Sequence, residues 1–215
     1  NTAFNDGGGA LILGAAVITD TAFMNNLSGL HGGGAQFEGA AHVANSTYIN
    51  NTSVSGGGAY FKTASAKQLM NVLFARNSAA TNGAAIYVAD ASPLALVHVT
   101  IAGPALNPRA AIFVQGGTVS ITNSIVASHT TGIQRTGGVV SENYNVFANT
   151  TQFDGSVSSG GASITGVMSF VAPATDDYRL TAGSAAINRG VDMGVDTDFF
   201  GDVRPQGGGF DVGYD

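Results

Sequence analysis

The C-terminal quarter of the sequence holds most of its carboxylates, and carboxylates at this density could bind a cation. Residues 151–215 carry nine Asp and three Arg, whereas residues 1–150 carry five acidic and five basic groups. Four of the nine Asp lie in the stretch VDMGVDTDFFGDV, in which Gly201 could make a turn. Carboxylate oxygens are the ligands that Ca²⁺ prefers. We therefore predict a candidate calcium site formed by Asp192, Asp196, Asp198 and Asp202.

The alternative is that these acids have a structural role. The order of ligands in an EF-hand is absent, because no Glu closes the stretch. Asp side chains also cap turns and pair with Arg, and here the partners would be Arg179, Arg189 and Arg204. An excess of acids over these three Arg would leave a solvated acidic face. The sequence indicates no cofactor other than calcium.

Residues suited to catalysis are scattered over the rest of the chain. A polysaccharide lyase or hydrolase needs clustered carboxylates, often with a Lys or Arg nearby. The five acids of residues 1–150 fall at different repeat positions, so no face of the molecule would gather two or three of them. The sequence has no Cys, which excludes thiolate catalysis and Cys-based zinc sites. We therefore lean towards a protein without catalytic activity.

Three sets of apolar residues recur with one shared period of about 25 residues, and they would position the polar side chains. The segments 20–26, 45–51 and 71–77 align residue for residue, and 98–104 and 123–129 follow with more divergence. Their central column consists of Phe23, Tyr48, Phe74, Ile101 and Val126, with Phe4 expected before it and Phe147 after it. The second column is Ile12, Phe37, Phe61, Tyr87 and Phe113. The third column is Ile18, Val43, Leu69, Leu96 and Ile121.

The repeat is too short to hold a helix in each unit. Short alternating apolar stretches such as VSI and AIF leave no room for the helix of about 10–15 residues that βαβ repeats contain. Three short strands and three turns do fit, and each strand would pair in parallel with its equivalent one coil away, about 4.8 Å along the axis. The sequence thus predicts an all-β fold, a right-handed parallel β-helix (solenoid) with about 25 residues per coil.

Asn residues flank the central column at two repeat positions. One set is Asn45, Asn71 and Asn123, and the other is Asn26, Asn51 and Asn77. His98 falls in the first set and His129 in the second. Stacked Asn amides can hydrogen-bond along the axis and to the backbone of turns. We therefore predict two structural Asn ladders, with ligand binding by these side chains as the alternative.

The periodicity weakens after Val140. We expect residues 1–150 to form the parallel β-helix coils and residues 151–215 to form an irregular final coil and a C-terminal cap within the same structural unit. An open β-helix end exposes unpaired backbone groups and the apolar interior, so the cap is expected to cover that end.

The C-terminal stretch DYRLTAGSAAINRG, followed by TDFFGDVRPQGGGFDVGYD, resembles the C-terminal signature of bacterial "choice-of-anchor Q" proteins. The resemblance covers residues 168–215, with Ala185 in place of the family's Pro and Asn188 in place of its Asp. It implies an exported or surface-associated parallel β-helix. The Phe-x-x-Asn and Gly-Gly-Ala pairs of residues 1–90 are also similar to the repeats of polymorphic outer-membrane adhesins, which implies surface exposure and adhesion.

From these observations we expect a non-catalytic, extracellular or cell-surface β-helix that serves as a structural scaffold, an adhesin or an assembly module able to form filaments. The alternatives are a carbohydrate-active enzyme and a glycan-binding module that uses Tyr48, Tyr60 or Tyr87 as stacking platforms. Expected partners are a surface or extracellular polysaccharide or protein, or a second copy bound end to end. The absence of a basic stripe argues against nucleic acid, and no apolar run reaches the ~18 residues of a membrane span.

Overall fold

The computed structural model describes residues 1–215, and it confirms the predicted solenoid. The chain winds into a parallel β-solenoid of about six coils with about 25 residues in each, and it contains almost no helix. We number the coils 1 to 6 by their residue in the central column, from Phe23 in coil 1 to Phe147 in coil 6. No helix is long and apolar enough to cross a membrane.

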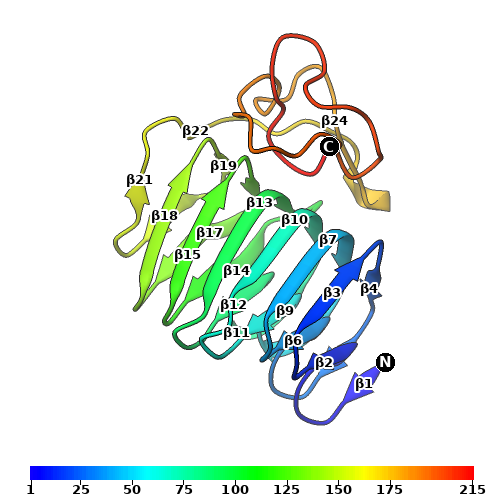
Figure 1. Cartoon of the computed structure of the whole chain (residues 1–215), viewed down its shortest axis with the longest axis vertical. Helices are drawn as coiled ribbons and strands as arrows, with labels where there is room; N and C mark the ends of the chain where they lie inside the picture. The colour runs from blue at the N-terminus through cyan, green and yellow to red at the C-terminus, as the bar shows by residue number, and fades with distance from the viewer.

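Three parallel sheets form the walls of the solenoid (Figure 1). Sheet A contains β1 (Thr2–Ala3), β5 (Leu27–Ser28), β8 (Thr52–Ser55) and β11 (Ser78–Asn82). Sheet B contains β2 (Ala10–Ile12), β6 (Ala35–Phe37), β9 (Ala59–Phe61), β12 (Ile86–Val88), β14 (Asn107–Val114), β17 (His129–Arg135) and β20 (Thr151–Asp154). Sheet C contains β3 (Ala16–Thr19), β4 (Ala22–Met24), β7 (Ala41–Ile49), β10 (Lys67–Ala75), β13 (Pro93–Ala102), β15 (Thr118–Thr122), β16 (Ile125–Ala127), β18 (Val139–Asn143), β19 (Val146–Ala148), β21 (Ser158–Ser159) and β22 (Ile164–Thr165).

Sheet C bends at one residue per coil, where the backbone is left-handed. The φ angles there lie between 46° and 56° at Asn45, Asn71, His98, Asn123 and Tyr144. Asn tolerates this conformation better than most side chains, which explains why Asn recurs at the position. We call this position the left-handed corner. In each coil, sheet C therefore has a first half before the corner and a second half after it.

Glycines recur where the chain turns into sheet B. Gly32 and Gly56 have φ angles of 62° and 66°, a region that L side chains rarely adopt. Gly34 faces the interior, where an added Cβ would lie 2.7 Å from the Tyr48 ring. The Gly-Gly-Ala pattern thus reflects two requirements, a tight turn and then close packing against the central column.

Two apolar columns are confirmed as stacks inside the solenoid. In the central column the backbone register pairs Phe23 with Tyr48, Tyr48 with Phe74, and so on to Phe147. The Phe23, Tyr48 and Phe74 rings stack with centroids 4.6 Å apart. The column from Ile18 to Ile121 is likewise in register. These side chains form one continuous core.

The second predicted column was wrong beyond Phe61. The register pairs Phe61 with Val88, so Val88 and Val114 continue the interior column. Tyr87 pairs instead with Tyr60, and Phe113 pairs with Tyr87, on the outer face of sheet B. A shift of one residue exchanges the two faces of a strand. Because aromatic residues occupy both faces of sheet B here, the sequence pattern did not reveal this shift. Phe4 was also misplaced, because it follows β1 in sheet A and is 92% exposed.

The C-terminal segment lies beside the solenoid and does not cover its end. Residues 166–215, which we call the tail, form the antiparallel pair β23 (Phe170–Ala172) and β24 (Asp177–Leu180), the short 3-10 helix η1 (Pro173–Thr175) and loops. The tail turns back and runs along the second halves of the sheet C strands (Figure 1). The interior at the last coil is instead bordered by Phe153 and Val157. The expected cap is therefore a lateral cover.

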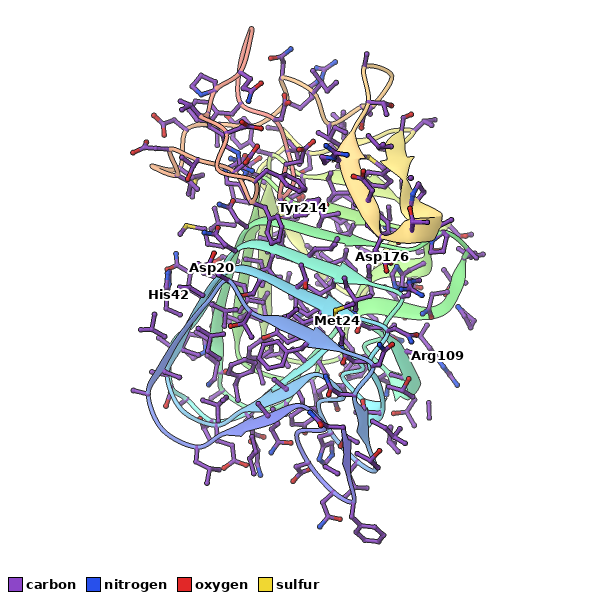
Figure 2. All side chains as sticks on the ribbon, turned by 90° about the vertical axis from the view of Figure 1, so that its right-hand side faces the viewer. Asp20, Met24, His42, Arg109, Asp176 and Tyr214 are labelled. Atoms are coloured by element: carbon purple, nitrogen blue, oxygen red, sulfur yellow. The ribbon has the colours of Figure 1, made fainter.

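The tail takes this path because sheet C is apolar on both faces after the corner. Leu73, Ile125 and Val146 point outward in coils 3, 5 and 6 and would be exposed without it. Tyr178 and Tyr214 of the tail pack on this surface. Figure 2 shows Tyr214 at the junction between the tail and the strands. Burial of this second apolar cluster stabilises the docked tail.

Candidate functional site

A long groove lies on the outer face of sheet C before the left-handed corner. One row of outward-facing side chains, one from each coil, crosses the groove. Its members are in backbone register, so neighbouring ones lie about 4.8 Å apart along the solenoid axis. The row consists of Val17, His42, Gln68, Ala95, Ser120, Ser141 and Ser158. Its central members are small or carry neutral polar groups. His42 points outward from the solenoid (Figure 2), and its Nδ1 lies 3.1 Å from Oε1 of Gln68.

Two hollows that share Ser120 make up the groove. The first has a volume of about 660 Å³ and spans coils 1 to 5, with Ala15, Ala40, Ala66 and Ala95 among its lining residues. The second has a volume of about 300 Å³, and its lining is almost entirely polar. The groove is thus apolar at its N-terminal end and rich in hydroxyl groups at its C-terminal end.

Three ionisable residues line the groove, and two of them have their charged atoms turned away. Lys67 is 3% exposed, and its ammonium donates to the carbonyl oxygens of Lys62, Thr63 and Ser65 at 2.8, 3.2 and 2.7 Å. Burial lowers the pKa of Lys67 to about 8. Glu142 is buried and accepts hydrogen bonds from Asn145 Nδ2, at 2.9 Å, and from the Ser163 hydroxyl. The third residue is His42, so the surface of the groove carries little charge.

Lys67 and Glu142 stand at interior positions that apolar residues fill in other coils. Lys67 pairs with Leu94, and Glu142 pairs with Ile121. They belong to coils 3 and 6, so three coil spacings of about 4.8 Å separate their backbones. That separation is too large for direct proton transfer between the two side chains. In the sequence, these two residues could have been recognised because they are charged at repeat positions where the other coils have apolar residues.

The residues of one predicted Asn ladder are hydrogen-bonded in series. The backbone N–H and the side-chain Nδ2 of Asn26 both donate to Oδ1 of Asn51, at 3.0 and 2.9 Å. Asn51 makes the same two bonds to Asn77, both at 3.0 Å. The Nδ2 groups of Asn51 and Asn77 also donate to interior carbonyl groups of the preceding coil. Each Asn in this row therefore acts as one rung of a structural ladder.

The other Asn row lies at the left-handed corner and holds the tail. Asn71 Nδ2 donates to Oδ1 of Asn45 at 3.2 Å and to the Thr197 carbonyl at 2.9 Å. Asn123 Nδ2 donates to the Val191 carbonyl, and its Oδ1 accepts the Val191 N–H. These side chains thus bind a partner, but that partner is the protein's own C-terminal segment.

The four acids of the candidate calcium site do not converge. Asp192 Oδ1 accepts the N–H of Gly194, and Asp198 Oδ1 accepts the N–H groups of Phe200 and Asp202. Asp192, Asp196 and Asp202 are exposed, while Asp198 is buried. No three His, Asp or Glu side chains are grouped so that they could hold a metal ion. Calcium binding stays a prediction to which the geometry adds no support.

Arg204 anchors the tail at the left-handed corner. Its Nη1 donates to Oδ1 of Asn71 at 2.7 Å and to the Thr197 carbonyl at 3.2 Å, and its Nη2 donates to the Gly213 carbonyl at 2.9 Å. The same carbonyl lies 3.1 Å from Nδ1 of His98. Arg204 is buried, and this burial lowers its pKa to about 10. Arg204 therefore docks the tail on the solenoid.

Two buried His residues should make stability depend on pH. Burial, with the charge of Arg204 as a second cause, lowers the pKa of His98 to about 3, and burial lowers that of His129 to about 4. Between pH 6.5 and 4 the unfolded chain binds protons at these residues and the native protein does not. The free energy of unfolding should therefore fall on acidification, by about 1.4 kcal/mol per pH unit for each His.

The variant His98→Asn tests this pH dependence, because Asn is the residue that recurs at the corner. We expect the variant to lose stability more slowly than the wild type, by about 1.4 kcal/mol per pH unit, in urea unfolding at pH 6.5, 5.5 and 4.5. Contributions from carboxylates are common to both proteins and cancel in the difference. Equal slopes for the two proteins would show that His98 is protonated in the native state.

The aromatic residues do not form a platform for sugar rings. Tyr48 is fully buried in the central column. Tyr60, Tyr87 and Phe113 lie on the outer face of sheet B, but their rings stack on one another with centroids 4.9 Å apart. Both faces of the Tyr87 ring are thus covered by neighbouring rings, and Tyr60 also packs on the His31 ring, so a ligand would meet mainly ring edges. The geometry therefore gives the Tyr platform hypothesis no support.

Comparison of the chain with protein-family models, with curated proteins and with solved structures found no match.

Proposed function

We propose that this protein is a non-catalytic, exported or cell-surface β-solenoid that binds an extended neutral polysaccharide in the groove of sheet C. The observation that carries the proposal is the continuity of the groove over successive coils. A rigid solenoid with such a groove would serve as an adhesive or scaffolding module. The resemblances of the tail to choice-of-anchor Q proteins and of the coils to outer-membrane adhesins support the surface location.

The repeat of the groove suits a polymer better than a compact ligand. The same row position recurs about every 4.8 Å, so an extended chain would meet a new side chain at each coil. The row from His42 to Ser158 offers imidazole, amide and hydroxyl groups, which match sugar hydroxyls in hydrogen bonding. Little charge is exposed, because the ammonium of Lys67 and the carboxylate of Glu142 are buried. A neutral polysaccharide is therefore favoured over a polyuronate.

Filling the groove should abolish binding. Ala95 lies in the middle of the row, and Ala95→Trp would place a large ring across the path of the ligand. We expect at least a tenfold loss of affinity for a neutral polysaccharide that binds the wild type, measured by affinity electrophoresis over a panel of glucans, xylans and mannans. The matched control is Thr52→Trp at an exposed position of sheet A, which should bind as the wild type does.

The panel should also contain pectin and alginate. Unsaturated products or new reducing ends from any of these polymers would overturn the non-catalytic assignment. If no neutral polysaccharide binds the wild type, or if Ala95→Trp binds as well as the control, the groove is not the binding site.

A further inference from the structure

The ladder of Asn26, Asn51 and Asn77 is missing a rung in coil 4. In coils 2 and 3 the turn after sheet C has two residues, of which the second is the ladder Asn. In coil 4 the segment 103–106, with sequence GPAL, separates β13 from β14 and bulges outward. In coil 5 the ladder position is taken by His129, whose N–H donates to Oδ1 of Asn149 at 3.1 Å. Asn107 lies opposite His129 in backbone register, but its Nδ2 donates to the Asn77 carbonyl at 3.1 Å and its Oδ1 accepts the Arg109 N–H, so its side chain makes no ladder bond. The gap in the ladder therefore lies between Asn77 and His129.

A cavity of about 260 Å³ lies at this gap. Its inner wall is apolar and consists of core residues, namely Phe74, Ala85 and Ile101. Asn77 and His129 are among the polar residues that line it, and the 103–106 segment forms an outer wall. Its volume is close to the lower limit of about 300 Å³ for ligand pockets, so a single sugar unit is an appropriate size.

Two polar groups are left without protein partners on either side of the missing rung. The N–H groups of Asn26 and Asn51 each donate to the next Asn, but the N–H of Asn77 has no acceptor in the protein. His129 is 4% exposed, and its Nδ1 donates to the Ala127 carbonyl at 2.7 Å. Its Nε2 is then an acceptor that no protein donor reaches. Burial lowers the pKa of His129 to about 4, so the ring is neutral near pH 7.

The missing rung has the hydrogen-bonding pattern of one amide group. An amide offers a carbonyl acceptor on one side and an N–H donor on the other, which is the pair that Asn77 and His129 require. Adjacent coils repeat at about 4.8 Å, the spacing at which amides link in parallel sheets. We propose that this cavity binds the acetamido group of an N-acetylated amino sugar, with its carbonyl on the Asn77 N–H and its N–H on Nε2 of His129.

The apolar wall favours an acetamido group over the carboxamide of a peptide Asn. The acetamido methyl would pack on Phe74 and Ile101, whereas a primary carboxamide has a second N–H that would meet apolar atoms without an acceptor. The Ser78 and Ser128 hydroxyls also line the cavity and could bond the sugar ring. This site lies apart from the groove of sheet C, and the inference does not depend on the proposed function.

The test is an NMR titration of the full chain with N-acetylglucosamine. We expect the Asn77 amide signal and the His129 ring ¹⁵N signals to shift saturably with the acetamido sugar and with N-methylacetamide, which has the same single N–H. Glucose and glucosamine should bind at least tenfold more weakly. The peptide Gly-Asn-Gly tests the carboxamide source, and tighter binding of that peptide would overturn the assignment to a sugar. Equal binding of glucose, or shifts confined to the groove of sheet C, would also overturn it.

A variant with the rung restored provides a second readout. Replacing residues 103–106 by a single Asn gives coil 4 the two-residue turn of coil 2, with Asn107 as its second residue, and should fill the cavity with a protein amide. We expect this variant to lose the shifts caused by N-acetylglucosamine, and Val139→Ala, at an exposed position outside the cavity, to retain them. Retained binding in the refilled variant would contradict the proposal. The titrations of the wild type with the sugars, the amide and the peptide need no variant. They therefore test the acetamido site even if the shortened chain does not fold.

Discussion

The variant Arg204→Met should lose about 3 kcal/mol of unfolding free energy, because it removes one partner from a buried, charge-assisted hydrogen-bond network. Asn71 Oδ1 and the Gly213 carbonyl both lose a donor inside the protein. Met keeps much of the side-chain volume, so the effect reports the lost hydrogen bonds. Denaturant unfolding followed by circular dichroism measures the stability, and limited proteolysis shows whether residues 166–215 become accessible.

The control for Arg204→Met is Arg189→Met in the same tail. Arg189 is exposed and makes no side-chain hydrogen bond, so its replacement should change stability by less than about 0.5 kcal/mol. Equal stability of the two variants would mean that Arg204 does not anchor the tail. Rapid proteolysis of the tail in the wild type would lead to the same conclusion.

The variant Phe74→Ala should lose about 4 kcal/mol, within the range found for Phe-to-Ala changes in packed cores. Phe74 is fully buried in coil 3, and its ring stacks on Tyr48 with centroids 4.6 Å apart. Neighbouring coils are held in register by hydrogen bonds and cannot easily close the cavity that the change leaves. Thermal or urea unfolding measures the loss.

The residue Phe4 provides a matched control for the change at Phe74. The sequence alone assigned both residues to the central column, yet Phe4 is 92% exposed. The variant Phe4→Ala should therefore be within about 0.5 kcal/mol of the wild type. A loss of several kcal/mol at Phe4, or a loss below about 1 kcal/mol at Phe74, would contradict the assigned coil register.

The stacking of the coils could be predicted because one side chain per column must meet its equivalent in each neighbouring coil. This rule placed Phe23, Tyr48 and Phe74 correctly. It failed at Tyr87, because aromatic residues occupy both faces of sheet B there and periodicity alone cannot tell the faces apart.

The path of the tail was not predicted, although the sequence carried a signal for it. In the segment 72–74, with sequence VLF, consecutive residues are apolar, so the strand cannot have one face in water. An outer apolar face requires a cover, and only the fold shows that residues 166–215 supply it. The groove was missed for a related reason: its small residues are unremarkable in the sequence and matter only as a surface.

The lateral position of the tail has a consequence for how the protein unfolds. In a solenoid each coil contacts only its neighbours, so coils can open one after another from an end. The tail contacts Ile49 in coil 2, Asn71 in coil 3 and Asn123 in coil 5. It couples coils that do not touch one another, and coils 2 to 6 should therefore exchange their amide hydrogens as one cooperative unit. Coil 1, where Met24 is 46% exposed, lies outside this coupling and should open first.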